Sequence, residues 1–211
     1  MKGLKKIVII GPESTGKSTL CKQLAHHYKT LWVPEFAREY LEKHGTDYSY
    51  ENLLTIAKAQ IELEEQYEKA MGNGQWSMVK GQGSIVNNES DSPLTIHHSP
   101  LTPHHSPSSL LFIDTDMYVM KVWCEFAFDK CHNWILNQIA ARQYNLYLLC
   151  NVDLIWIKDN LREYPNFEIR NKLYRYYQDL MINQGTPWVE ISGDYKQRLK
   201  KSIDTINSTI T

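Results

Sequence analysis

Residues 4–10 read LKKIVII and residues 11–18 read GPESTGKS, and this short stretch decides the fold. The first part ends in a run of β-branched residues, which is typical of a strand buried on both faces of a parallel sheet. The second part matches the pattern G-x-x-x-x-G-K-[ST] at every fixed position, and a helical pattern follows from Lys17 to about Tyr28. A buried strand, a glycine-containing loop and a helix in this order form the context in which the pattern binds phosphate. The sequence therefore predicts a phosphate-binding loop at residues 11–18.

The residue types of this loop suit a nucleoside triphosphate and its metal ion. Glycines allow successive backbone N–H groups to converge on a phosphate, and the start of a helix adds the positive end of its dipole. Lys17 is expected to reach the β- and γ-phosphates of ATP, and Ser18 is expected to hold Mg²⁺. The expected nucleotide-binding residues of the loop are Gly11, Glu13, Ser14, Thr15, Gly16, Lys17, Ser18 and Thr19. The alternative is an ordinary glycine-rich turn with a serine at the helix N-cap.

Apolar strands alternate with helical patterns along the rest of the chain. Further strands are expected at 31–34, 110–114, 146–150 and 188–191. Helices are expected at 35–44, 50–71, 117–128, 133–143, 159–164, 167–184 and from about 195 onward. This alternation predicts an α/β fold with a five-stranded parallel sheet and helices on both faces. Ligands of such sheets bind beyond the carboxyl ends of the strands, so the residues at those ends are the candidates for function.

An acidic and basic group follows the expected strand at 31–34. On a helix, Glu35, Arg38 and Glu39 share one face because of their i, i+3, i+4 spacing. A carboxylate close to the transferable phosphate can accept the proton of an attacking hydroxyl, and Arg38 can orient the acceptor or stabilise charge. The alternative is a surface salt bridge with acidic residues in the first helical turn. Beside a phosphate-binding loop, the functional interpretation is favoured.

A second pair of carboxylates closes the strand LLFID at 110–114. An apolar strand that ends in aspartate commonly supplies the carboxylate that holds Mg²⁺, directly or through water, and we expect Asp114 in this role. Asp116 follows two residues later. The sequence leaves open whether Asp116 contacts the acceptor, replaces Glu35 as general base, or caps the next helix.

Basic residues follow the fourth expected strand. Arg162 and Arg170 fall in a region that forms a lid in many small phosphotransferases, where closure brings guanidinium groups onto the transferred phosphoryl group. The alternative is a solvated helix face with neighbouring acidic partners. The residues alone do not decide between these interpretations.

Composition and charge exclude several classes of protein. The 211 residues are 42% hydrophobic and 22% charged, which is typical of one globular domain and not of a disordered chain. The formal net charge of −1 provides no general attraction to nucleic acid or to an anionic membrane. No apolar run approaches the ~18 residues that span a bilayer, and the N-terminus carries no signal-peptide pattern. The four cysteines show no C-x-x-C spacing, so we expect a cytoplasmic protein with free thiols.

Residues 72–109 differ in composition from the rest of the chain. They contain four of the eight prolines, and the sequence HHSP occurs twice, at 97–100 and 104–107. So few apolar residues cannot offset the entropy of ordering, which predicts a low-complexity, disordered insertion within a single domain of residues 1–211. Two histidine pairs could bind a transition metal, but disorder is the favoured interpretation.

Five blocks of the sequence resemble, in order, those of the NadR-type nicotinamide-riboside kinase (ribosylnicotinamide kinase) family. The blocks are GPESTGKSTL (11–20), PEFAREYL (34–41), FIDTD (112–116), NLYLLCNVDLIWIKDNLRE (145–163) and VEISGDYKQRL (189–199). The phosphate-binding loop is generic, whereas the later blocks are more specific, and the resemblance runs from about residue 5 to 206. It implies a P-loop NTPase and kinase fold, a three-layer sandwich with a helical lid. It also implies transfer of the ATP γ-phosphate to the 5′-hydroxyl of nicotinamide riboside, which gives nicotinamide mononucleotide, an NAD precursor.

The resemblance also implies roles for individual residues. Glu35 and Arg38 fall where related kinases engage the riboside, and Arg162 and Arg170 correspond to lid arginines. The loop at 192–195, with Gly193 and Tyr195, would lie near the adenine. Trp156 matches an aromatic position that could face the cationic pyridinium ring.

The sequence departs from the family pattern at several points. Ile155 stands where proline is usual and Asn160 where glycine is common, while residues 72–109 have no recognised counterpart. No H-x-G-H motif occurs, so adenylylation of the product is not expected. Two other functions stay open: a kinase of another nucleoside or small metabolite, and a non-kinase P-loop ATPase or ATP-binding regulator. A GTPase is disfavoured because Asn171-Lys172 is not followed by x-Asp, and an AAA+ motor is disfavoured because little sequence follows the expected nucleotide-binding core. The expected partner is a small molecule, and the oligomeric state is unknown.

Overall fold

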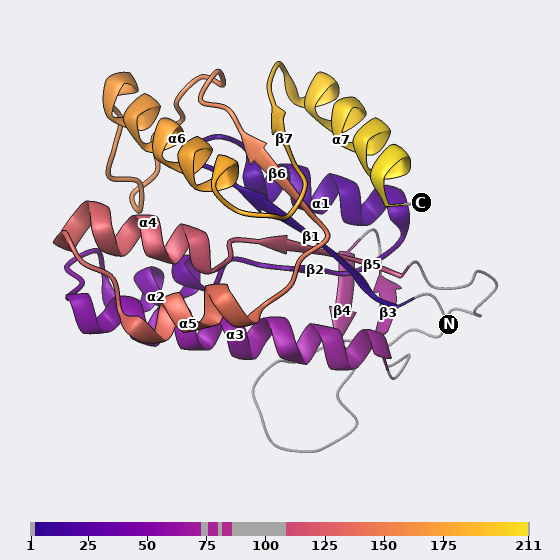
Figure 1. The fold of residues 1–211 in the computed structure, drawn as a ribbon, viewed down its shortest axis with the longest axis horizontal. Helices are drawn as coiled ribbons and strands as arrows, with labels where there is room; N and C mark the ends of the chain where they lie inside the picture. Colours follow the sequence, from indigo (N-terminus) through magenta and orange to yellow (C-terminus); the bar gives the residue numbers. More distant parts are fainter. Residues whose placement is uncertain (1–2, 73–75, 80–81, 86–108, 211) are drawn as a thin grey trace.

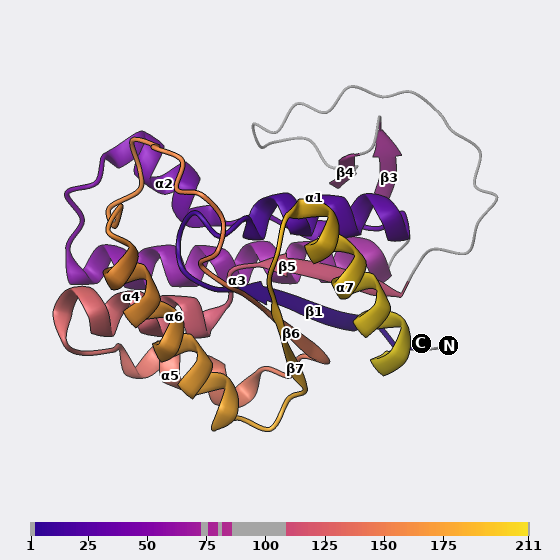
Figure 2. The same cartoon turned by 90° about the horizontal axis from the view of Figure 1, so that it is seen from above.

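The computed structural model describes residues 3–72, 76–79, 82–85 and 109–210, and the side chains within 76–79 and 82–85 are left out of the description. Figure 1 shows the arrangement of its helices and strands, and Figure 2 shows the same elements from above.

The centre of the molecule is a five-stranded parallel sheet with the order β2-β5-β1-β6-β7 (Figure 1). Its strands are β1 (Lys5–Ile10), β2 (Trp32–Val33), β5 (Leu110–Asp114), β6 (Leu146–Cys150) and β7 (Trp188–Ile191). Ile9 of β1 pairs with Asp114 of β5 and with Leu148 of β6. The loop that follows Ile10 therefore begins beside Asp114, and both lie at the carboxyl edge of the sheet, where ligands of such sheets bind.

Helices cover both faces of the sheet. They are α1 (Lys17–Tyr28), α2 (Phe36–His44), α3 (Tyr50–Gly72), α4 (Met117–Phe128), α5 (Asn133–Ala141), α6 (Phe167–Ile182) and α7 (Tyr195–Thr209). Successive residues of β1 point to opposite faces, as the strand geometry requires. Ile7 and Ile9 pack in one core cluster with α1 and α7, and Val8 and Ile10 pack in another with α4 and α6 (Figure 2). This confirms the predicted three-layer P-loop kinase fold.

The expected helix at 159–164 is not formed. The chain runs from Asn151 to Asn166 without a helix, with one turn at 160–161, and α6 begins only at Phe167. The backbone N–H groups of Glu163 and Tyr164 donate to the carboxylate of Glu13 instead of to carbonyl groups four residues earlier. The prediction of a helix here was therefore wrong, because a side chain distant in sequence takes the backbone donors that a helix would use. We call residues 151–166 the lid segment.

A short antiparallel hairpin forms within the segment 72–109. Its strands are β3 (Trp76–Val79) and β4 (Gln82–Ile85), and Met78 pairs with Gly83. The expectation of a structureless insertion did not include these two strands. The other residues of the insertion, with both HHSP sequences, lie outside the described residues, so that expectation stays a prediction for them.

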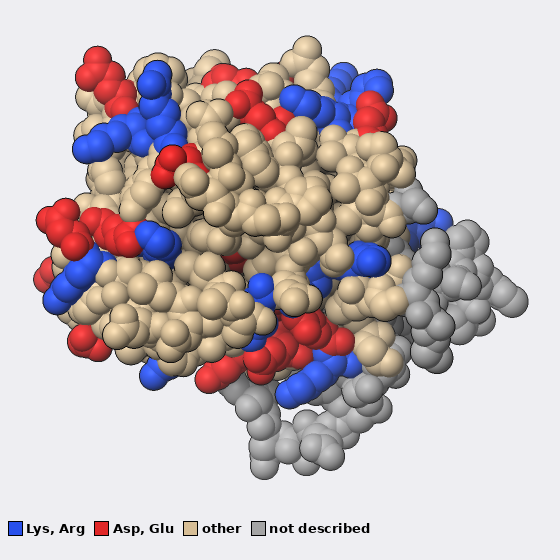
Figure 3. Space-filling view, in the orientation of Figure 1, with Lys and Arg blue, Asp and Glu red and all other residues tan. Residues whose placement is uncertain are grey.

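The surface in Figure 3 carries acidic and basic side chains next to one another, as expected for a net charge of −1. All four cysteines are free thiols, and Cys21, Cys124 and Cys150 are buried. Among the described helices, none combines the length and apolar character needed to cross a bilayer.

Candidate active site

The phosphate-binding loop connects β1 to α1, and its backbone conformation requires glycine at two places. Gly11 has a φ of +137°, and a Cβ there would lie 2.6 Å from the carbonyl oxygen of Cys150. Gly16 has a φ of +79° and directly precedes α1. Residues other than glycine rarely adopt these backbone angles. The two glycines therefore let the loop turn tightly, with its N–H groups available to an anion. Ser14 also has a positive φ, +57°.

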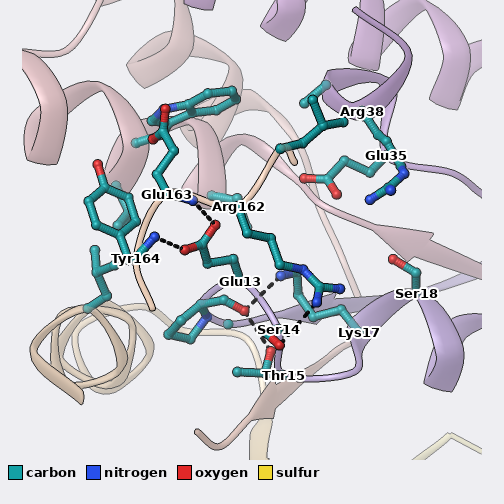
Figure 4. Close-up of a pocket in the computed structure, with 18 of the residues that line it drawn as sticks. Glu13, Ser14, Thr15, Lys17, Ser18, Glu35, Arg38, Arg162, Glu163 and Tyr164 are labelled. Carbon is teal, nitrogen blue, oxygen red and sulfur yellow. Dashed lines mark hydrogen bonds between the residues drawn. The ribbon is translucent and has the colours of Figure 1, made fainter. Parts of the chain in front are cut away.

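Two side chains brace the loop from within. The ammonium group of Lys17 donates to the carbonyl oxygen of Pro12 at 2.9 Å, and the hydroxyl of Thr15 donates to the same oxygen at 2.7 Å. Figure 4 shows the Lys17 side chain beside the guanidinium group of Arg162. Lys17 therefore lies within the loop, and its contact with the β- and γ-phosphates stays a prediction.

Asp114, at the end of β5, is a buried carboxylate without a hydrogen-bond partner. Its side chain is fully buried, and neither oxygen accepts a hydrogen bond within the described part of the chain. Burial, the largest cause, and the nearby charge of Glu35 raise the pKa of Asp114 to about 7, while Lys17 opposes this shift. The nearby hydroxyl of Ser18 also lowers the pKa of Asp114, although the two side chains are not in hydrogen-bond contact.

An unpaired buried carboxylate beside a hydroxyl suits a hard cation such as Mg²⁺. This ion commonly takes one or two protein ligands and completes its shell with phosphate oxygens and water. Within the described residues, no group of three or more His, Cys, Asp or Glu side chains could hold a metal. The donor set of Asp114 and Ser18 therefore fits Mg²⁺ bound together with a nucleotide, and it lacks the nitrogen and sulfur ligands typical of zinc.

Glu35 lies at the N-cap of α2, where β2 ends. Its side chain lines the same pocket as Lys17 and Ser18, and Figure 4 shows it facing this space. The Thr115 hydroxyl donates to the Glu35 carboxylate at 3.3 Å. Thr115 is buried and has a φ of +81°, an unfavourable conformation for a β-branched residue. Strain of this kind is concentrated at functional sites, where the surrounding structure maintains it.

Two arginines, one on α2 and one in the lid segment, line the pocket. Arg38, on α2, donates to the carboxylate of Asp159 in the lid segment at 2.8 Å and is about half exposed. Arg162, in the lid segment, donates to the hydroxyl of Ser14 at 3.3 Å and to the carbonyl oxygen of Ile157. The structure thus brings Arg162 to the phosphate-binding loop, and its role as a lid arginine stays a prediction.

The pocket extends from the phosphate-binding loop into an apolar chamber, and its volume is about 230 Å³. The chamber is lined by residues of α2, α4, α6 and the lid segment, which are Ala37, Leu41, Val119, Val122, Trp123, Phe126, Leu161, Glu163, Tyr164, Leu173 and Tyr177. The sequence analysis did not identify Trp123 or Phe126 as site residues, because a helix face that lines a chamber has the same apolar pattern as one that lines the core.

Asp116 does not line this pocket. One oxygen accepts hydrogen bonds from the backbone N–H groups of Tyr118 and Val119 at the start of α4, and the other accepts from the hydroxyl of Tyr147 at 2.9 Å. Burial raises the pKa of Asp116 to about 7, although these three hydrogen bonds oppose the shift. Of the alternatives left open by the sequence, the structure places Asp116 in the capping position.

Arg170 and Trp156 also lie outside the pocket lining. The guanidinium group of Arg170 lies 5.2 Å from the centre of the Trp156 ring, and that of Arg162 lies 5.8 Å from it. Arg170 is 4% exposed, and its Nε and Nη1 atoms find no hydrogen-bond partner in the described residues. The Trp156 ring therefore already faces guanidinium groups, a different partner from the pyridinium ring that the resemblance implied.

Gly193 and Tyr195, the residues expected near the adenine, lie on the α7 side of the phosphate-binding loop. A Cβ at Gly16 would lie 3.3 Å from Cε1 of Tyr195. Arg198 of α7 joins the loops around them, and the sequence analysis did not identify it. Its guanidinium group donates to the carbonyl oxygens of Thr15, Asn151 and Gly193 and also pairs with Asp153. An arginine in the first turn of a charged helix gives no sequence signal for such a role.

The strand, the glycine-containing loop and the buried carboxylate of the neighbouring strand define a P-loop nucleotide-binding protein with the kinase fold. A family model described as an AAA domain (AAA_28) matches residues 6–80 and 101–198. The chain belongs to this family.

Two proteins of known name are similar to this chain in sequence. The trifunctional NAD biosynthesis/regulator protein NadR of Escherichia coli (strain K12) is 20% identical over 206 residues, which are 96% of this chain and 42% of the relative. NadR of Salmonella typhimurium is 20% identical over 205 residues, with the same coverage. The chain therefore spans less than half the length of these relatives.

Solved structures show the same fold. A crystal structure of NadR protein in complex with NR has a TM-score of 0.67 and 17% identity, and the match covers 98% of this chain and 51% of the other. The deoxyadenosine kinase from M. mycoides with bound dATP has a TM-score of 0.50 and 12% identity, over 96% of this chain and 99% of the other.

Proposed function

We propose that this chain is an ATP-dependent kinase that phosphorylates the 5′-hydroxyl of nicotinamide riboside to give nicotinamide mononucleotide, a step of NAD salvage. The observation that carries the proposal is one continuous pocket. It is lined by the phosphate-binding loop with Lys17 and Ser18, by Glu35, and by the apolar residues of the chamber. A pocket of this kind can hold a triphosphate and a small acceptor with a carboxylate between them.

The chamber favours a compact, planar and cationic acceptor. Trp123, Phe126, Tyr164 and Tyr177 offer aromatic rings, and Glu163 adds a negative charge. Aromatic faces and carboxylates both attract a cationic ring such as pyridinium. The whole pocket, including its end at the phosphate-binding loop, has a volume of about 230 Å³, which favours small-molecule ligands over a polypeptide or a nucleic-acid strand. The similar NadR protein was crystallised with NR, which supports a riboside as the acceptor.

The proposed reaction assigns the proton and the phosphoryl group as follows. The acceptor hydroxyl gives its proton to the Glu35 carboxylate as its oxygen forms a bond to the γ-phosphorus of ATP. The bond between that phosphorus and the bridging oxygen of ADP breaks, and ADP leaves. Lys17 and Arg162 stabilise the negative charge on the transferred group, and Arg38 orients the riboside.

The buried carboxylate of Asp114 and the hydroxyl of Ser18 would hold Mg²⁺. When bound, the ion neutralises phosphate charge. Arg170 stays a candidate lid arginine, and Gly193 and Tyr195 stay candidates for the adenine side. We further propose that residues 1–211 act as one domain with an insertion at 72–109. The free thiols fit a reducing compartment, so we propose a cytoplasmic location.

The test is a coupled assay of ADP release with Mg²⁺-ATP and a panel of acceptors that includes nicotinamide riboside, deoxyadenosine and uridine. We expect ADP release that depends on nicotinamide riboside, together with nicotinamide mononucleotide identified by mass. Equal ADP release without any acceptor would show an ATPase. ATP binding without release would show a regulator, and preference for another acceptor would correct the substrate.

Matched variants test the assigned residues. Lys17→Ala should lower turnover by at least about a hundredfold because it removes charge stabilisation that acts only during transfer. Glu35→Gln should lower kcat by about a hundredfold with little change in ATP affinity, since it removes only the proton acceptor. Glu39→Gln is the control, because Glu39 is exposed and pairs only with Lys43 among the ion pairs of the described residues. Normal turnover of the first two variants would contradict the assignment.

A further inference from the structure

Glu13 occupies a variable position of the phosphate-binding loop, and its side chain faces the lid segment. Its carboxylate accepts hydrogen bonds from the backbone N–H of Glu163 at 3.1 Å and from that of Tyr164 (Figure 4). These residues are about 150 positions away in sequence. A carboxylate would repel a phosphate at close range, so its contact with two backbone donors argues against a direct role in nucleotide binding.

Ser14, the next residue, also contacts the lid segment. Its hydroxyl oxygen accepts from the backbone N–H of Ile157 at 3.2 Å and from Nη1 of Arg162 at 3.3 Å. Two adjacent side chains of the phosphate-binding loop thus make four hydrogen bonds to residues 157–164. Among the described residues, the other hydrogen bonds and ion pairs that tie 157–164 to the rest of the molecule are Arg38 with Asp159 and Tyr48 with Glu163, and both lie at exposed positions where they contribute little. The ring of Tyr164 also packs against Phe126.

The hydrogen bonds of Glu13 are the stronger pair of this set. A carboxylate that accepts two backbone N–H groups makes charge-assisted bonds, and Glu13 is only partly exposed. Arg162 directly precedes Glu163 in the sequence. Its guanidinium group donates to the hydroxyl of Ser14 in the phosphate-binding loop. Leu161, Glu163 and Tyr164 of the same turn line the acceptor chamber. The position of this turn therefore decides both where Arg162 lies and whether the chamber is closed.

We infer that Glu13 is a positioning residue that fastens lid residues 157–164 to the phosphate-binding loop and so places Arg162 over the transferred phosphoryl group. The fastening of the lid segment rests on the contacts above, whereas the placement of Arg162 over a transferred phosphoryl group and the kinetic consequence rest on the proposed function. When the lid segment is released, its N–H groups are solvated, Arg162 leaves the loop, and the chamber opens to water. ATP binding itself does not require Glu13, because the loop backbone and Lys17 supply the phosphate contacts.

The first test measures the lid segment without any substrate. Trypsin cleaves after Lys158 and Arg162 when the segment opens, and mass spectrometry identifies the fragments. We expect Glu13→Ala to raise the cleavage rate at these two bonds by about tenfold or more, since two charge-assisted hydrogen bonds are lost. Glu13→Gln should give a smaller increase because its amide oxygen still accepts hydrogen bonds. Glu39→Gln is the control and should cleave like the wild type, and unfolding midpoints identify any variant that does not fold.

The second test is kinetic. Glu13→Ala should lower kcat by about tenfold or more while the dissociation constant of ATP changes less than about threefold, and Glu13→Gln should recover part of kcat. Unchanged cleavage combined with weaker ATP binding would overturn the inference and make Glu13 a nucleotide ligand. Unchanged cleavage with unchanged kinetics would also overturn it. A failure of the riboside assay would refute the proposed substrate but leave the cleavage result to decide the role of Glu13.

Discussion

The buried carboxylate of Asp114 lowers the stability of the folded protein, but it is suited to bind a metal ion. Its carboxylate has no hydrogen-bond partner in the described residues and a pKa raised to about 7. A buried charge without a partner destabilises the folded state. Sites of this kind are retained where function requires them, at a cost in stability.

Replacing this carboxylate should stabilise the metal-free protein. With a chelator present, we expect Asp114→Asn to raise the free energy of unfolding by about 2 kcal/mol at pH 8, or about 4–8 °C in midpoint. An acid whose folded-state pKa is raised destabilises the fold increasingly as pH rises from about 3.8 to about 7. The gain should therefore be small near pH 4 and constant above pH 7, as measured by thermal unfolding across pH. A lower midpoint at pH 8 would contradict this interpretation.

Individual site residues differed in how far the sequence could predict them. Lys17, Glu35 and Asp114 follow strand ends, and parallel strands bring their carboxyl ends to one edge, so their proximity was predictable. Asp116 follows the same strand, yet it faces the start of α4, because β5 ends at Asp114, the backbone turns at Thr115 with its positive φ, and Asp116 is already the N-cap of α4. Glu13 could not be assigned to the lid, since its partners are about 150 residues away and are backbone groups, which carry no sequence signal.

Helix α7 illustrates how one element holds three loops of the site. Arg198 is 2% exposed and contacts the phosphate-binding loop, the end of β6 and the loop before α7. A guanidinium group with this many acceptors fixes their relative positions, because a flexible or shorter side chain cannot reach them together.

Arg198→Met should loosen this part of the site. We expect the free energy of unfolding to fall by about 2–4 kcal/mol, since buried carbonyl groups and Asp153 lose their partner. The dissociation constant of ATP should rise because Thr15 lies within the phosphate-binding loop. Urea unfolding and ATP titration measure the two effects. Asp194→Asn, which changes a capping residue of the same helix, is the control for stability. An unchanged ATP affinity would contradict the role assigned to Arg198.

The sequence predicted the helices and strands well, but it predicted the non-helical lid segment poorly. The strands at 110–114, 146–150 and 188–191 and the helix at 117–128 have the predicted bounds. Most of their apolar residues are buried in the structure, and the burial of apolar surface is also what stabilises these elements. The helix expected at 159–164 failed because its donors are used by Glu13, a tertiary contact that local patterns do not contain.

In the whole molecule, the insertion and the site residues are attached to opposite ends of the strands. The insertion, residues 72–109, joins α3 to β5 at the amino end of β5, whereas the site residues follow the carboxyl ends of the strands. The described pocket-lining residues belong to the phosphate-binding loop, α1, α2 with its N-cap residue, α4, α6 and the lid segment.

Removal of the insertion should therefore preserve the fold and the activity. We expect a variant in which a short Gly/Ser linker replaces residues 73–108 to unfold cooperatively and to keep kcat roughly unchanged, because loop length affects stability only weakly. β4 contacts α1, so a small loss of stability is expected. Circular dichroism, thermal unfolding and the coupled assay measure these quantities. Loss of cooperative unfolding would show that the insertion is part of the core.

The sheet also ends in very short strands on both sides. β2 has two residues and β7 has four. An unpaired strand at a sheet margin offers backbone donors and acceptors on which another polypeptide can add, and the risk grows with the number of unpaired groups. So few groups provide a poor template for strand addition. The concentrated native protein should therefore resist aggregation through its sheet, even though the three central strands are almost entirely apolar.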